Sequence, residues 1–165
     1  PLLGSAVLGN YSLALQVITV LTMFTTILFK YLLPQESSGI QNRFLIRIVV
    51  LISTLMTILG VFLAPIIIPN FFPKYLEASI AIQIMSLSII AITIDTICTS
   101  RLLAKEKSKV VLFGGIIGLS VMITGVLILG STFGTIGIAI AFVLSSISKA
   151  TYLGLTLKRY ERSVN

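Results

Sequence analysis

A lysine lies deep inside an apolar stretch of this 165-residue chain, where a charge is unfavourable unless it has a partner or reaches water. Lys149 precedes Lys158 by about nine residues, which is about 13 Å if the segment is helical. A cation at that depth is disfavoured by about 2.5–3.5 kcal/mol on membrane-insertion scales. We predict that Lys149 faces an aqueous path and attracts an anionic group, the alternative being that its side chain extends to the interface.

Asp95 is the acidic residue inside a second apolar stretch. It lies about six residues, or about 9 Å by helix rise, from Arg101. Two roles are therefore open for its carboxylate, which can pair with a basic side chain at that end of the stretch or line the same aqueous path as Lys149.

Polar side chains recur at helical spacing along several stretches. One face carries Ser12, Gln16, Thr19, Thr26 and Lys30, another carries Ser79, Gln83, Ser86 and Thr93, and a third carries Ser145, Lys149, Tyr152 and Thr156. A single hydroxyl is usually satisfied by its own helix or a neighbour, whereas aligned polar faces on several helices predict a water-accessible cavity. The candidate cavity residues are Lys149, Gln16, Gln83, Tyr152 and Asp95, with Lys30 and Arg101 nearer one mouth.

The elements that position these residues are five apolar stretches, at about 11–33, 45–68, 78–98, 110–130 and 134–157. Each has about 20 residues or more, enough to cross a hydrocarbon core of about 30 Å as a helix. Backbone amides cannot go unpaired in lipid, so such segments must be helical. The mean hydropathy of +1.10 and a charged fraction of 10%, against about 25% in soluble proteins, agree. We predict an all-α membrane protein with about five transmembrane helices.

The basic residues indicate the orientation of these helices. Ten lie in or beside the first and third connections or after the last stretch, and the second connection has Lys74 alone. Alternate connections of a polytopic protein lie on one side of the membrane, and basic residues concentrate on the cytoplasmic side. We therefore expect a multi-pass protein of the cytoplasmic membrane with its N-terminus outside and its C-terminus in the cytoplasm. This charge pattern predicts contact with membrane lipid and no nucleic-acid partner.

Composition excludes several kinds of chemistry. With no His, one Cys and five acidic residues, the chain has neither a His- or Cys-based metal site nor a Ser/His/Asp or Cys/His catalytic set. It has no phosphate-binding P-loop, and Cys98 cannot form an internal disulfide. We predict no enzyme activity, no cofactor and no metal.

Prolines and glycines predict the ends and contacts of the helices. Pro34 is expected to end the first span, and Pro65 and Pro69 to kink or end the second. Gly114 and Gly118 form a GxxxG pair, which lets another helix approach closely. We also expect a fragment, because the chain begins at Pro1, and no signal peptide, because no basic segment precedes the first span.

Several local patterns resemble one family when taken in order. They are Gly9–Ala14 (GNYSLA), Leu33–Pro34, Tyr75–Ala78 (YLEA), Gln83–Ser86 (QIMS) and Phe133–Ala141 (FGTIGIAIA). In this order and spacing the chain resembles the C-terminal part of polysaccharide (O-antigen, Wzx-type) flippases of the multidrug/oligosaccharidyl-lipid/polysaccharide exporter superfamily. The resemblance covers nearly the whole chain, although each motif alone is weak.

The resemblance implies that residues 1–165 are the C-terminal transmembrane portion of a transporter with twelve or more helices. Such proteins flip polyprenyl-(pyro)phosphate-linked glycans across the cytoplasmic membrane by alternating access, with the substrate in a cavity between two halves. The implied partners are that glycan and either the N-terminal half of the same protein or an oligomeric partner. Lys149 would then attract the pyrophosphate.

Two alternatives to a flippase remain open. A cation-coupled multidrug-type antiporter would depend on Asp95 rather than Lys149. A non-transporting scaffold subunit of a glycan-assembly complex would instead present its Gly114 and Gly118 face to a partner.

Overall fold

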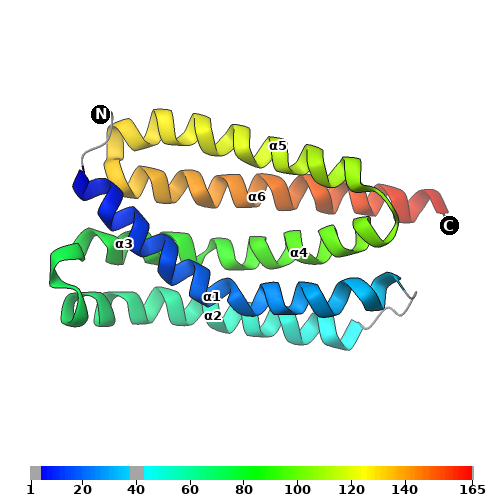
Figure 1. Ribbon diagram of the computed structural model, residues 1–165, viewed down its shortest axis with the longest axis horizontal. Coiled ribbons are helices and arrows are strands. Elements are labelled where there is room, and N and C mark those ends of the chain that lie inside the picture. Colours follow the sequence, from blue (N-terminus) through cyan, green and yellow to red (C-terminus); the bar gives the residue numbers. More distant parts are fainter. Residues whose placement is uncertain (1–4, 38–42, 165) are drawn as a thin grey trace.

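The structure is a computed structural model that describes residues 5–37 and 43–164, which form a bundle of helices (Figure 1). In chain order the elements are α1 (Ser5–Ser37), α2 (Arg43–Phe71), the 3-10 turn η1 (Pro73–Tyr75), α3 (Leu76–Ser86), α4 (Ser88–Ala104), α5 (Ser108–Gly125), the π-helical turn η2 (Val126–Gly130) and α6 (Ser131–Val164). The prediction of an all-α architecture is confirmed.

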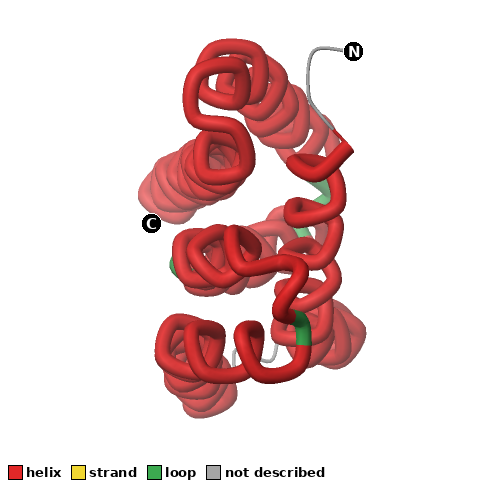
Figure 2. The backbone as a smooth tube through the Cα atoms, turned by 90° about the vertical axis from the view of Figure 1, so that its left-hand side faces the viewer, coloured by secondary structure: helices red, strands yellow, loops and turns green. Residues whose placement is uncertain are grey.

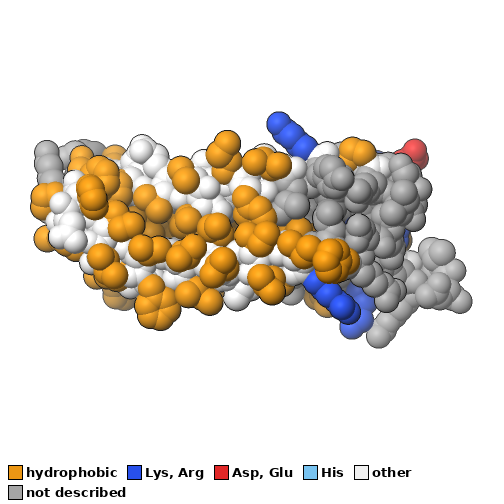
Figure 3. Space-filling view, turned by 90° about the horizontal axis from the view of Figure 1, so that it is seen from below, with side chains coloured by type: hydrophobic (Ala, Val, Ile, Leu, Met, Phe, Trp, Pro, Cys, Tyr) orange, Lys and Arg blue, Asp and Glu red, His pale blue; other side chains and the backbone are white. Residues whose placement is uncertain are grey.

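Three helical ranges of the described chain are long and apolar enough to cross a membrane, namely Val7–Ile27, Ile46–Phe71 and Ser108–Tyr160. The bent pair α3 and α4 makes a fourth if it counts as one span. The range Ser108–Tyr160 folds back on itself, so that α5 and α6 lie antiparallel (Figure 1). Hydrophobic side chains cover most of the described surface on the face in Figure 3, with Lys and Arg toward one end. This surface fits a protein embedded in lipid.

The third predicted span is wrong as a single helix, because it is broken at Leu87 with a bend of 41° between α3 and α4. Two serines flank the break and use their hydroxyls locally: Ser86 Oγ donates to Ile82 O at 2.7 Å and Ser88 Oγ to Met85 O at 2.6 Å. Gly60 of α2 lies against Ser86, and a Cβ at that position would collide with the serine hydroxyl. A serine hydroxyl that bonds a carbonyl of its own helix competes with the backbone amide for that carbonyl, which favours a bend.

Pro34 does not end the first helix as predicted, and of the two outcomes expected at Pro65 and Pro69, a kink or a helix end, the helix end is not seen at either. Pro34 lies inside α1, which continues to Ser37, and α2 continues through Pro65 and Pro69 to Phe71. A helix near its last turn tolerates a proline, since one lost backbone hydrogen bond can be made up there by the surroundings. Residues 38–42, in the connection between the first two predicted stretches, lie outside the described residues.

Close contacts between small residues hold α5 and α6 together. The chain reverses between Gly130 and Gly137, where Gly134 has φ 56° and ψ −129°, a left-handed conformation that glycine adopts most easily. The predicted stretches 110–130 and 134–157 left residues 131–133 as the connection, whereas these residues are helical and the reversal lies at Gly134. A Cβ on Gly137 would collide with the backbone carbonyl of Leu129, and a Cβ on Gly125 would come within 2.6 Å of Ala141 Cβ.

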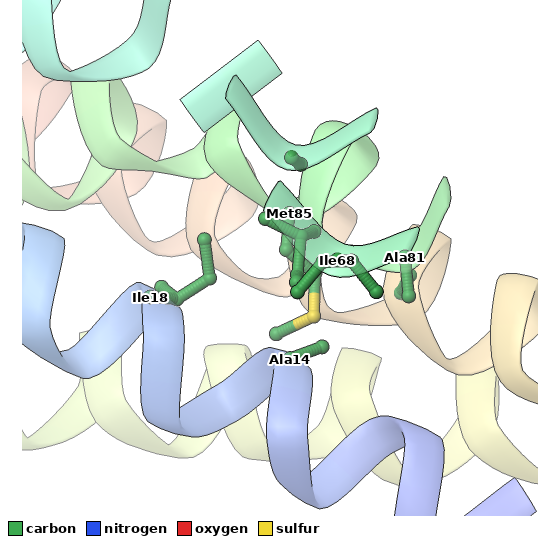
Figure 4. Close-up of a cluster of buried hydrophobic side chains, with 8 residues drawn as sticks. Ala14, Ile18, Ile68, Ala81 and Met85 are labelled. Atoms are coloured by element: carbon green, nitrogen blue, oxygen red, sulfur yellow. The ribbon is translucent and has the colours of Figure 1, made fainter. Parts of the chain in front are cut away.

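Small and flexible apolar side chains fill the centre of the bundle. Ala14 and Ile18 of α1 meet Ile68 of α2 and Ala81 and Met85 of α3 (Figure 4). Figure 2 shows the bundle along its helices. Within it, α4 packs against α1, α2 and α6. Small side chains let the helices approach one another closely. The resulting van der Waals packing drives helix association in a membrane, because lipid tails are as apolar as the helices themselves.

The basic connections gather at one end of the bundle. The end of α1, the α4–α5 turn and the end of α6 lie together, opposite the start of α1 and the α5–α6 reversal (Figure 1). The α4–α5 turn carries Lys105 and Lys107, α5 carries Lys109 at its start, and α6 carries Lys158 and Arg159 toward its end. The predicted clustering of basic residues on one side is therefore present in the fold.

Candidate functional site

The candidate site is an ion pair between two helices that are distant in sequence. Lys149 Nζ of α6 donates to Asp95 Oδ2 of α4 at 2.8 Å. The side chains retain 32% and 17% of their exposure respectively. The hydroxyl of Thr99, one turn after Asp95, donates to Asp95 Oδ1 at 3.2 Å, so both carboxylate oxygens are engaged. Neutralising both charges removes most of the penalty for placing either of them among apolar helices.

The helix next to Lys149 leaves space for its side chain. A Cβ on Gly118 of α5 would lie 3.5 Å from Lys149 Cβ and 3.6 Å from its Cδ. One turn earlier on α6, Ser145 Oγ donates to Gly118 O at 2.8 Å. The stem of the lysine therefore runs along α5 while its ammonium group reaches α4.

The pair opens onto a small polar cavity of about 190 Å³. Its walls are Thr26, Asp95, Thr96, Thr99 and Lys149. Hydroxyl, carboxylate and ammonium groups lie together there, so the cavity can hold water or a small anionic group beside Lys149. No three His, Cys, Asp or Glu side chains within 5–37 and 43–164 gather as a metal site would require.

Thr26 joins this cavity to the polar face of α1. Ser12, Gln16, Thr19, Thr26 and Lys30 are all exposed, and Met23 between them is 63% exposed. These residues share the face that their spacing predicted. A face of this kind on an otherwise apolar helix requires water or another protein segment beside it.

The polar face of the third predicted span lies elsewhere. Ser79, Ser86 and Thr93 are buried, and Gln83 Nε2 donates to Val61 O of α2 at 3.0 Å. Thr93 Oγ1 and Ser53 Oγ of α2 share a hydrogen bond of 2.7 Å. These groups join α3 and α4 to α2, so Gln83 is not beside the Lys149 cavity.

Thr93→Val tests this packing role. The substitution keeps the side-chain shape and removes the hydroxyl, and we expect it to lower the free energy of unfolding in detergent by about 0.6 kcal/mol, the average for such bonds in membrane proteins. Thr54→Val is the matched control, because Thr54 is exposed and bonds Val50 O within its own helix. Equal losses in both variants would contradict an α2–α4 contribution.

The remaining predicted residues fall into different surroundings. Tyr152 packs against an apolar cluster formed by Cys98, Leu102, Leu153 and Leu157. Gln16 and Lys30 are exposed on α1, and Arg101 lies half-buried near the end of α4. The sequence left two roles open for Asp95, pairing with a basic side chain at the end of its own stretch or lining the same path as Lys149. In the structure its carboxylate pairs with Lys149.

Gly114 and Gly118 are buried against α6 of the same chain. A Cβ on Gly114 would lie 2.8 Å from Leu153 Cδ2. The predicted close approach of another helix is present, and α6 makes it. The scaffold alternative needed this face for a separate partner, so its expected docking surface is already covered.

A second polar cluster, which the sequence did not single out as a site, lies at the opposite end of the bundle. Asn10 Nδ2 of α1 donates to Glu77 Oε2 of α3 at 3.1 Å, and Thr135 Oγ1 of α6 donates to the same oxygen at 3.4 Å. Asn10 and Thr135 are buried, and Asn10 Oδ1 has no hydrogen-bond partner among the described residues. The available signal was that the three residues of the cluster lie in three of the family-like motifs. The cluster ties three helix beginnings together.

Comparisons of the chain with protein-family models, with curated proteins and with solved structures find no match in any of the three.

Proposed function

We propose that this chain is the C-terminal part of a flippase for polyprenyl-(pyro)phosphate-linked oligosaccharides. The observation that carries the proposal is the Asp95–Lys149 pair, which lines a polar cavity inside an apolar helical bundle. Ionisable residues in such surroundings usually belong to a transport path. The order of the family-like motifs supplies the substrate class.

The exposed polar face of α1 supports an aqueous path shared with another part of the transporter. It leads through Thr26 to Lys149, and its residues need water or polar groups opposite them. In this proposal the helices cross the cytoplasmic membrane five times, with α3 and α4 forming one broken span. The basic end is cytoplasmic, by the distribution of Lys and Arg.

Lys149 is the residue that would meet the substrate. In the structure its ammonium group has a carboxylate partner, and a pyrophosphate entering the cavity offers a more highly charged one. The pyrophosphate would replace Asp95 as the partner of Lys149. The lysine would then hold the headgroup and would have an anionic partner both before and after substrate binding. The low local dielectric strengthens this attraction relative to water.

The antiporter alternative assigns the central role to Asp95. A transported cation could bind this carboxylate only after Lys149 leaves it, because the lysine already neutralises the charge. The cavity gives Asp95 the exposure that such an exchange needs. Loss of transport in Asp95→Asn, together with normal transport in Lys149→Ala, would favour the antiporter.

The direct test uses the full-length protein in proteoliposomes. A fluorescent polyprenyl-pyrophosphate oligosaccharide is added, and an impermeant quencher reports the fraction exposed on the outer leaflet. We expect Lys149→Gln to slow flipping at least about tenfold, equivalent to about 1.4 kcal/mol of lost interaction. Lys109→Gln removes an exposed charge at the basic end and should leave the rate unchanged. Equal rates for Lys149→Gln and the native protein would overturn the proposal.

Water access to the Lys149 side of α6 can be measured separately. In a Cys98→Ala background, we expect Lys149→Cys to react with a membrane-impermeant thiol reagent, because the side chain lines the polar cavity. Thr151→Cys, two residues away on the opposite face of α6, should react far more slowly in intact membranes. Protection of residue 149 in every transport state would contradict an aqueous path.

A further inference from the structure

An apolar groove of about 580 Å³ lies along the surface between α4 and α6. Its lining includes Leu87 at the break between α3 and α4, Ile94 of α4, and Ile147, Gly154, Leu155 and Lys158 of α6. The large apolar side chains among these are exposed. Two helices therefore form the walls of the groove, and their exposed apolar side chains favour contact with hydrocarbon over contact with water.

The groove is separate from the Asp95–Lys149 site. Ile147 and Thr151, which line the groove, each stand two residues from Lys149, so they point about 160° away from it around α6. The Lys149 cavity and the groove share no lining residue. An occupant of the groove would not compete with a ligand of the cavity.

The length of the groove matches one leaflet of a bilayer. From Ile147 to Lys158 the helix rises by about 16 Å, about half of a hydrocarbon core of about 30 Å. The groove begins near Leu87, at the bend between α3 and α4, and ends at Lys158 among the basic residues. A partner's transmembrane helix would need contact along the whole core, whereas one acyl chain fills this length.

The two ends of the groove differ in charge. Lys158 is exposed at one end, followed by the exposed Arg159, while the remainder of the lining is apolar apart from Thr151. A phosphate at the headgroup level would meet the lysine ammonium, with its hydrocarbon continuing toward the bilayer centre. This is the charge distribution of a lipid.

We propose that the α4–α6 groove binds an anionic phospholipid, with one acyl chain between the helices and its phosphate against Lys158. Gly154 provides the room, because no described atom lies within 4 Å of the position that its Cβ would take. A large side chain there would enter the groove without striking the fold. The proposal does not depend on what the protein transports.

The test compares lipid retention by the full-length protein and its variants. Each protein is released from nanodiscs of equal phosphatidylglycerol and phosphatidylcholine, and native mass spectrometry measures the bound phosphatidylglycerol. We expect Lys158→Gln to reduce retention about fivefold, the effect of losing one basic contact at a membrane surface. Gly154→Leu should also reduce retention, because its side chain would occupy the groove.

Two matched controls separate this site from the general lipid annulus. Gly115→Leu places the same side chain on α5 where the Cβ position is also open, and Lys109→Gln removes another exposed charge at the basic end. Both should retain phosphatidylglycerol as the native protein does. Equal retention in all five proteins, or equal loss in the controls, would overturn the proposal.

Two further outcomes would assign the groove to another occupant and so also overturn the proposal. One is loss of co-purifying polyprenyl phosphate in Gly154→Leu with phosphatidylglycerol unchanged. The other is a change in oligomeric mass of Gly154→Leu, which would indicate a protein segment. Lys158→Gln does not alter packing in the groove, so it remains informative if Gly154→Leu fails to fold.

Discussion

Replacing Asp95 alone with leucine is expected to destabilise the protein more than replacing both Asp95 and Lys149 with leucine. The single change leaves an ammonium group without its counter-charge among apolar helices. Removing one partner of a fully buried pair costs about 3–5 kcal/mol, and the 32% exposure of Lys149 reduces this to about 2 kcal/mol. The double change removes both charges and their desolvation, so most of the stability should return.

The measurement is a double-mutant cycle of the free energy of unfolding in detergent, run beside the flipping assay. Recovery of stability without recovery of flipping would separate the two roles of the pair: Asp95 keeps the lysine satisfied in the empty site, and Lys149 meets the substrate. Rapid flipping by the double leucine variant would show that the pair is purely structural. Additive losses in the cycle would show that the two side chains do not interact.

Gly137→Ala should be the most damaging single methyl addition among the glycines that the structure describes. Its Cβ would meet the backbone carbonyl carbon and oxygen of Leu129 and would lie 3.0 Å from the backbone nitrogen of Gly130. Backbone atoms cannot move aside as a side chain can, so the α5–α6 reversal itself must shift. We expect the free energy of unfolding to fall by about 3 kcal/mol, at the upper end of the range for overpacking.

Gly115→Ala is the matched control, since a Cβ there meets no described atom within 4 Å. Alanine favours a helix over glycine by up to about 1 kcal/mol, so this control should be neutral or slightly stabilising. Thermal unfolding of both variants in the same detergent compares them directly. A Gly137→Ala protein as stable as the control would mean that the two helices do not approach so closely.

Hydropathy predicted the helices well, because every backbone group in lipid must bond within its own segment. The five stretches correspond to α1, α2, the α3–α4 pair, α5 with η2, and α6. The small residues at Gly114 and Gly118 also predicted a close helix contact, which α6 makes. The break at Leu87 was missed, because a serine is compatible with a continuous helix until a neighbour such as Gly60 packs beside it.

Side-chain spacing was less informative about the site. Spacing shows which residues share a helix face, but not which neighbouring helix that face contacts. A helix that is apolar on every side has no amphipathic pattern from which its rotation in the bundle could be predicted. The α1 face is exposed, while Gln83 and Thr93 face α2. Lys149 was identified from its charge alone. Its pairing with Asp95, 54 residues away in the chain, depends on α4 and α6 lying side by side, which spacing does not predict.

The order of Asp95 and Lys149 along the chain bears on how the protein enters the membrane. Asp95 belongs to α4 and is synthesised before α6, so its carboxylate is already in the bilayer when Lys149 arrives. A lysine in the middle of a helix opposes insertion by about 2.5–3.5 kcal/mol, and a waiting counter-ion offsets part of that barrier. The ion pair would thus act first during biogenesis, by drawing α6 into place, before the finished protein meets any ligand.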